Sequence, residues 1–164
     1  MVKEKDIRLR LKLRTFINVG DKFADLSTCL RAKVSAIIFP IDFSAIYAIG
    51  YNGPSRGRPN DSCTEVAGEC GCAHAEANAL IKFNANIAKP SLMYTTHHPC
   101  HYCAGLVLNC DKLVGVIYGA WMRNVRTNLG IELLEQASLP TFKKSVITTD
   151  LPKELIEILR GRRC

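Results

Sequence analysis

Residues 70–80 read "CGCAHAEANAL" and residues 97–105 read "HHPCHYCAG". The first stretch leads into residues 73–86, whose strong helix formers and apolar residues at helical spacing predict a helix that begins near His74 and Glu76. In the second stretch Pro99 stands where a helix begins, so Cys100 and Cys103 fall in its first turn. Two helix starts therefore carry side chains that bind metals, and the fold has to bring these two helix tips together.

The residue types at the two helix starts suit a zinc ion. A Cys-x-x-Cys pair in a first helical turn places both sulfurs on one side, and the helix dipole lowers the pKa of the thiols. Zinc binds sulfur and imidazole ligands tetrahedrally, so His74, Cys100 and Cys103 would leave one position open for water, as in catalytic sites. Zinc lowers the pKa of bound water to about 7. Glu76 is not needed as a ligand and is predicted to be the catalytic proton carrier.

The bulk composition is that of a globular chain. A length of 164 residues suits a single domain, residues 1–164, and 48% of the residues are apolar while 23% are charged. No apolar run is long enough to span a membrane, and the charged N-terminus lacks the apolar core of a secretory signal. We therefore expect a cytoplasmic protein. The net charge of +7 favours phosphorylated partners, although solubility explains it equally well.

Periodicity predicts ten main elements. The chain should begin with a helix at residues 5–19, which Gly20 and Asp21 interrupt before a second helical piece at 21–31. Two strands should follow at 33–42 and 44–51, joined by a hairpin at 40–43, and then a Gly- and Pro-rich loop at 51–72. The remaining elements alternate between helix and strand: helix 73–86, strand 91–97, helix 100–110, strand 112–120, helix 128–138, strand 142–149 and helix 152–163. This order predicts an α/β fold, a three-layer α-β-α sandwich around a mixed five-stranded sheet.

Several separate motifs carry a family resemblance. The pattern H-x-E…P-C-x-x-C is typical of zinc nucleobase deaminases. With "STCLRAKVSAIIF", "GYNGPSRG", "HAEANAL", "YTTHHPCHYCA" and "LVGVIYGAW", residues 20–140 resemble the zinc-dependent cytidine deaminase superfamily. Within it they are most similar to the deoxycytidylate (dCMP) deaminase family of bacteria and phages. The resemblance implies a cytidine deaminase-like fold, hydrolysis of dCMP to dUMP and ammonia, and a homo-oligomer of up to six subunits.

The resemblance also implies substrate contacts. Asn52 would bind the deoxyribose, although an Asn-Gly pair can be a simple turn. The other candidates are Lys33 and Arg56 for the phosphate, Asn78 on the helix face of His74, and Trp121 as a wall of the pocket. Each has a structural alternative: the two cations as ordinary surface charges, the asparagine as a loop cap, and the tryptophan as a core or oligomer contact. Two positions depart from the family pattern, since Ser55 replaces a proline and Ser35 a glycine. The segment between "GYNG" and "HAE" is short, so control by nucleoside triphosphates is not expected.

Four further cysteines form a second candidate site. Some bacterial and phage members of the family carry a structural zinc in this region, and four thiolates can close a tetrahedral site. We expect this second zinc at Cys29, Cys63, Cys70 and Cys72. His97 or His98 in place of one sulfur is an alternative, as is a set of small buried thiols.

Three other functions compete with dCMP deamination. A tRNA adenosine deaminase would use the same ligands and glutamate, but Asn78 and the "GYNG" loop favour a mononucleotide substrate. A deaminase of single-stranded DNA would need an aromatic, basic groove, and aromatic residues make up only 7% of the chain. A zinc module that only binds would not need Glu76. We expect neither nucleic-acid nor membrane partners, and the sequence leaves open whether modified cytosines are accepted.

Overall fold

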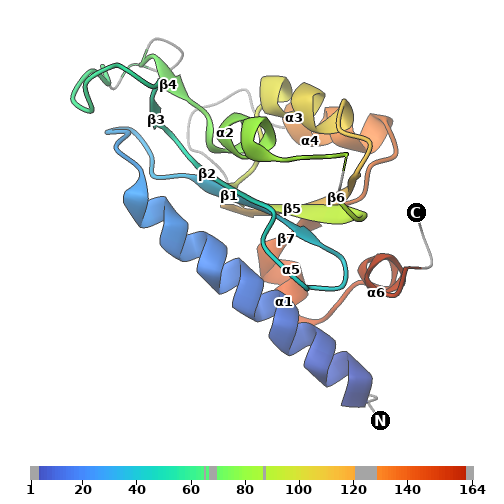
Figure 1. Ribbon diagram of the computed structural model, residues 1–164. Coiled ribbons are helices and arrows are strands. Elements are labelled where there is room, and N and C mark those ends of the chain that lie inside the picture. The colour runs from blue at the N-terminus through green and yellow to red at the C-terminus, as the bar shows by residue number, and fades with distance from the viewer. Residues whose placement is uncertain (1–3, 65, 67–69, 87, 121–128, 162–164) are drawn as a thin grey trace.

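A five-stranded mixed sheet lies between two layers of helices (Figure 1). The computed structural model describes residues 4–64, 66, 70–86, 88–120 and 129–161. The strands, in the order β2-β1-β5-β6-β7, are β2 (Ala48–Tyr51), β1 (Ser35–Pro40), β5 (Ser91–His97), β6 (Leu113–Ala120) and β7 (Thr141–Lys143). The expected three-layer sandwich with a mixed sheet is confirmed.

The strands on one side of β5 pair antiparallel and those on the other side pair parallel. Strand β1 pairs antiparallel with both β2 and β5, whereas β5, β6 and β7 run parallel. Helix α3 (His101–Leu108) follows the end of β5, and helix α2 (Ala75–Lys82) leads into its start. Both helices pack on the same face of the sheet. The N-termini of α2 and α3 therefore meet at the carboxyl end of β5.

Each face of the sheet has its own apolar core. Helices α1 (Glu4–Phe23), α5 (Lys144–Thr149) and α6 (Lys153–Leu159) cover one face, and α4 (Leu129–Gln136) joins α2 and α3 on the other (Figure 1). Side chains of β5 alternate between the two cores, as a buried strand requires. Leu92 and Tyr94 point toward α1, while Met93 points toward α2 and α3. The two helices that begin with the predicted metal ligands are thus packed on the buried sheet.

The N-terminal helix differs from the sequence prediction. Helix α1 continues through Gly20 and Asp21 to Phe23, and only a 3-10 turn, η1 (Ala24–Leu26), follows it. Gly20 packs against Tyr94, where an added Cβ would lie 2.6 Å from the ring atom Cδ1. The glycine was predicted to break the helix, but its position provides room for a buried ring. The Tyr94 hydroxyl donates a hydrogen bond to Asp21 at 2.5 Å, which holds α1 on the sheet.

Three other predicted elements need correction. The strand predicted at 142–149 is wrong beyond Lys143, because β7 pairs with β6 over three residues and α5 then begins. The predicted hairpin turn at 40–43 is longer, since β2 begins only at Ala48. The loop at 51–72 contains a small ribbon in which β3 (Gly53–Pro54) pairs with β4 (Cys72–Ala73). No helix in the described part of the chain is long and apolar enough to cross a membrane.

Candidate metal and catalytic site

One imidazole and two sulfurs meet at the two helix tips. His74 precedes the first residue of α2, and Cys100 precedes the first residue of α3. The Nδ1 atom of His74 lies 3.4 Å from Sγ of Cys100 and 3.4 Å from Sγ of Cys103. Zinc bonds of about 2.3 Å to sulfur and about 2.05 Å to nitrogen, at a tetrahedral angle, separate the ligand atoms by about 3.6 Å. The spacing of these three residues fits a tetrahedral zinc ion.

Glu76 is buried beside these ligands. It lies in the first turn of α2, and 4% of its surface is exposed. Burial raises the pKa of Glu76 to about 7. A carboxyl group that titrates near neutral pH can both accept and donate a proton, which suits a residue with alternating acid and base roles.

The contact between the two ligand thiols shifts their pKa values in opposite directions. A hydrogen bond from the Cys103 thiol lowers the pKa of Cys100 to about 3, and the same contact raises the pKa of Cys103. The hydrogen bond with Cys100 also raises the pKa of His74. One sulfur is therefore already poised as a thiolate, the form in which cysteine binds zinc.

A second group of four sulfurs lies close to the first site. The Sγ atoms of Cys29, Cys63, Cys70 and Cys72 all lie within 4.8 Å of one another. Cys29 and Cys63 are 3.8 Å apart at sulfur, whereas a disulfide bond measures about 2.05 Å. Two sulfurs on one tetrahedral zinc are about 3.8 Å apart. The donor set and its spacing fit a closed tetracysteine metal site, and this cluster includes neither His97 nor His98.

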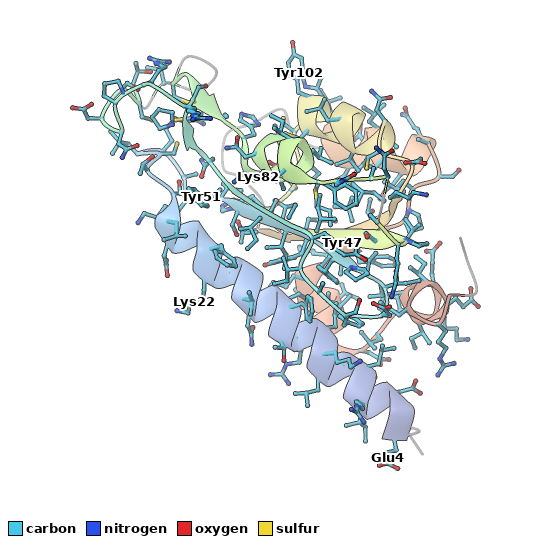
Figure 2. The ribbon with its side chains drawn as sticks, in the orientation of Figure 1. Glu4, Lys22, Tyr47, Tyr51, Lys82 and Tyr102 are labelled. Atoms are coloured by element: carbon cyan, nitrogen blue, oxygen red, sulfur yellow. The ribbon has the colours of Figure 1, made fainter. Side chains whose placement is uncertain are left out.

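A cavity of about 280 Å³ opens between the two cysteine groups. His74, Glu76 and Cys100 form one side, and Cys29, Cys70 and Cys72 form another. All four histidines of the chain line this cavity: His74, His97, His98 and His101. Tyr102 also lines it and rises from the outer side of α3 with 76% of its surface exposed (Figure 2).

Asn52 lines the cavity, as expected for a substrate contact, but most of its side chain is already engaged. Its Oδ1 accepts hydrogen bonds from the Ser27 hydroxyl at 2.6 Å and the Val34 amide at 2.8 Å. Its Nδ2 donates to the Ala32 carbonyl at 2.8 Å. One amide hydrogen remains for a ligand, because an asparagine amide has two.

The other predicted substrate residues are less well placed. Lys33 and Arg56 are exposed and do not line the cavity. Asn78 does not line it either, and its amide donates to the Tyr51 carbonyl at 2.9 Å, so it ties β2 to α2. Trp121 lies outside the described residues.

Sequence reasoning missed Arg31. Arg31 is among the residues that line the cavity, and it makes no ion pair with any residue that the structure describes. The only available signal was its place two residues after Cys29 and two before Lys33 in a segment without regular structure. That position in the sequence does not indicate which of Arg31 and Lys33 lines the cavity.

Residues 12–120 match the family described as the cytidine and deoxycytidylate deaminase zinc-binding region. A deoxycytidylate deaminase of Mycobacterium phage D29 is 27% identical over 107 residues, which cover 56% of this chain and 82% of that protein. A deoxycytidylate deaminase of Schizosaccharomyces pombe is 26% identical over 102 residues, and that match spans 54% of this chain and 31% of the yeast protein.

Among solved structures, the dCMP deaminase of cyanophage S-TIM5, in complex with dCMP and dUMP, is similar to this chain. The TM-score is 0.67 at 29% sequence identity, and the match covers 79% of this chain and 94% of the phage protein. The likeness therefore extends beyond the zinc-binding motifs to the sheet and its helical layers.

Proposed function

This chain belongs to the cytidine and deoxycytidylate deaminase zinc-binding family, and from that membership we propose that it hydrolyses dCMP to dUMP and ammonia. The observation that carries this proposal is the group of three zinc-fitting ligands, His74, Cys100 and Cys103, with the buried carboxyl of Glu76 beside it. Similar proteins that act on dCMP support the choice of substrate.

The three ligands would hold the zinc, and Glu76 would move protons. A zinc ion bound there supplies a water molecule acidic enough to react near neutral pH. Glu76 would accept a proton from the attacking water and deliver it to N3 of the cytosine as the water oxygen bonds to C4. Glu76 would then take the remaining proton from that oxygen and give it to the C4 amino nitrogen. The C4–N bond breaks, ammonia leaves, and C4 becomes the carbonyl carbon of uracil.

The rest of the cavity suits the sugar and phosphate of a nucleotide. The guanidinium of Arg31 is the cation that we assign to the 5′-phosphate, because arginine matches phosphate with two parallel hydrogen bonds. Lys33 and Arg56 are exposed and outside the cavity, so they are weaker candidates. The remaining amide hydrogen of Asn52 is available for a deoxyribose hydroxyl.

The number of zinc ions is a further part of the proposal. One ion would occupy the catalytic ligands, and a second, structural ion would occupy the four cysteines of the tetracysteine cluster. A homo-oligomer also remains proposed, and Ile81, Tyr102 and Leu106 offer exposed apolar contacts on α2 and α3. A single domain and a cytoplasmic location stay predictions.

The test is a substrate panel combined with metal analysis. The wild-type protein is given dCMP, dCTP, deoxycytidine and a tRNA anticodon stem, and ammonia and the ultraviolet change of the base are recorded. We expect turnover with dCMP and two zinc ions per chain. Glu76→Gln should keep both ions and lose activity by about 10²- to 10⁴-fold. Turnover of the tRNA alone, or normal turnover by Glu76→Gln, would falsify the proposal.

A further inference from the structure

The tetracysteine cluster joins two segments that are far apart in the chain. Cys63, Cys70 and Cys72 belong to the loop between β3 and α2, whereas Cys29 belongs to residues 27–34, which connect η1 to β1. A metal ion bound by all four sulfurs therefore cross-links this connecting segment to the loop. Cys63 is the one cysteine of the four that does not line the substrate cavity.

Asn52 fixes both ends of the connecting segment. The Ser27 hydroxyl contacts the Asn52 backbone carbonyl at 2.8 Å as well as its side chain, and the Ala32 carbonyl and Val34 amide bind the Asn52 amide group. Gly53 lies against the same segment, since an added Cβ there would be 2.7 Å from Oγ1 of Thr28.

Among residues 29–31, in the middle of the segment, Cys29 makes the contacts that hold the backbone in place. The amide of Cys29 donates to the Ser27 hydroxyl at 3.2 Å. For Leu30 and Arg31, the structure gives no hydrogen bond to any described residue. The backbone at Arg31 is thus held between the Asn52 contacts on one side and the sulfur of Cys29 on the other. Arg31 in turn lines the cavity that contains His74 and Glu76.

We propose that metal binding at the tetracysteine cluster positions Arg31, through Cys29 and residues 27–34, and so sets the preference for a phosphorylated substrate. The cluster then orients the residue that binds the phosphate, in addition to cross-linking the two segments. This inference rests on the proposed function, because it assumes that the cavity binds a nucleotide monophosphate. Arg31 contacts the ligand, and Cys63 acts only through the metal and Cys29.

The decisive variant is Cys63→Ser, which removes a metal ligand without altering the cavity wall. We expect its zinc content to fall from two ions to one. Calorimetry should show dUMP binding weakened by about 10- to 100-fold, the range expected when one hydrogen-bonded charge contact is lost. The ratio of kcat/KM for dCMP over deoxycytidine should fall by the same factor, mainly through KM. Arg31→Ala should give the same loss of preference with two zinc ions retained.

Four further variants keep the test independent of folding defects. Cys63→His preserves a zinc ligand and should restore both the second ion and the affinity for dUMP. Gly53→Ala brings a Cβ within 2.7 Å of Oγ1 of Thr28, a terminal side-chain atom that can rotate away, so it should keep both ions and the affinity for dUMP. Leu30→Ala changes an exposed side chain of the same segment and should match wild type. In the double variant of Arg31 and Cys63, the two losses of dUMP affinity should not add, because both substitutions remove the same contact with the phosphate.

Two results would overturn the inference. One is a Cys63→Ser protein with a single zinc ion and an unchanged preference for dCMP over deoxycytidine. The other is a double variant of Arg31 and Cys63 in which the two losses of dUMP affinity add. Either result leaves the proposed function intact if the wild type deaminates dCMP, whereas a wild type without such turnover contradicts the proposed function itself.

Discussion

Gly50 tests whether the catalytic helix is positioned by direct backbone contact with the sheet. Gly50 lies in β2, and a Cβ built there would be 2.0 Å from the Ala75 carbonyl oxygen and 2.4 Å from the Ala79 amide nitrogen. Both atoms are backbone atoms of α2, so no side chain can rotate away. Helix α2 would have to move by about 1 Å for the closer contact to reach 3.0 Å. His74 and Glu76 would move with it.

The expected cost of Gly50→Ala follows from that displacement. Overpacking of this kind costs about 1–3 kcal/mol of folding free energy. For a chain of this size the melting temperature should fall by roughly 2–12 °C. A 1 Å shift of catalytic groups lowers the rate by about 100-fold, which corresponds to about 2.7 kcal/mol of transition-state free energy. The activity should therefore fall much more than the folded fraction does.

The matched control is Gly105→Ala in α3. An added Cβ there meets nothing within 4 Å, although the residue is close to Cys103. Alanine should stabilise this helix by about 0.5–1 kcal/mol and leave kcat/KM unchanged. Calorimetry gives the melting temperatures, and the dCMP assay gives the rates. If Gly50→Ala has the melting temperature and kcat/KM of wild type, the idea that this contact fixes the catalytic helix is wrong.

Three further predictions concern the core, the α1 anchor and the metal ions. Leu13→Ala should cost about 2–5 kcal/mol in urea unfolding because Leu13 is fully buried, whereas Leu11→Ala, at a 64% exposed position of the same helix, should stay within about 0.5 kcal/mol. Tyr94→Phe removes the hydrogen bond to Asp21 and should cost about 1 kcal/mol without reducing kcat, because this contact faces α1 and away from the site. Dialysis at falling pH should release both zinc ions as cysteine and histidine become protonated, and the melting temperature should fall with the zinc content; a protein that loses its zinc without losing stability would contradict a structural role for the second ion.

The candidate zinc ligands could be picked out from the sequence because the relevant spacing is local. His74 and Glu76 lie at one helix start and Cys100 and Cys103 at another, and the helix formers after Ala73 and the proline at position 99 mark these starts. The meeting of the two starts follows from the position of both helices on one face beside β5. Strand β5 itself was predicted at its observed limits, Ser91–His97.

Where the prediction failed, a distant contact decided the local structure. Gly20 has a low helix propensity, but α1 continues through it because the ring of Tyr94, more than seventy residues away in sequence, fills the space beside it. The segment 142–149 has a strand-like composition, yet β6 pairs with it only as far as Lys143. Neither contact can be read from a window of neighbouring residues.

The cation that we propose for the phosphate also could not be identified from neighbouring residues in the sequence. Arg31 and Lys33 are both cationic, and they lie two residues apart in a segment that is neither helix nor strand. No periodicity assigns inner and outer faces there, so their orientation depends on what holds the backbone. Two groups hold this backbone. One is Asn52, which follows β2, and the other is the tetracysteine cluster, which is connected to the segment through Cys29. A chain with the same catalytic motifs but without these two groups should still deaminate the cytosine base. Its preference for dCMP over deoxycytidine should be weaker. Mutations should therefore be able to change the phosphate preference without abolishing the deamination reaction.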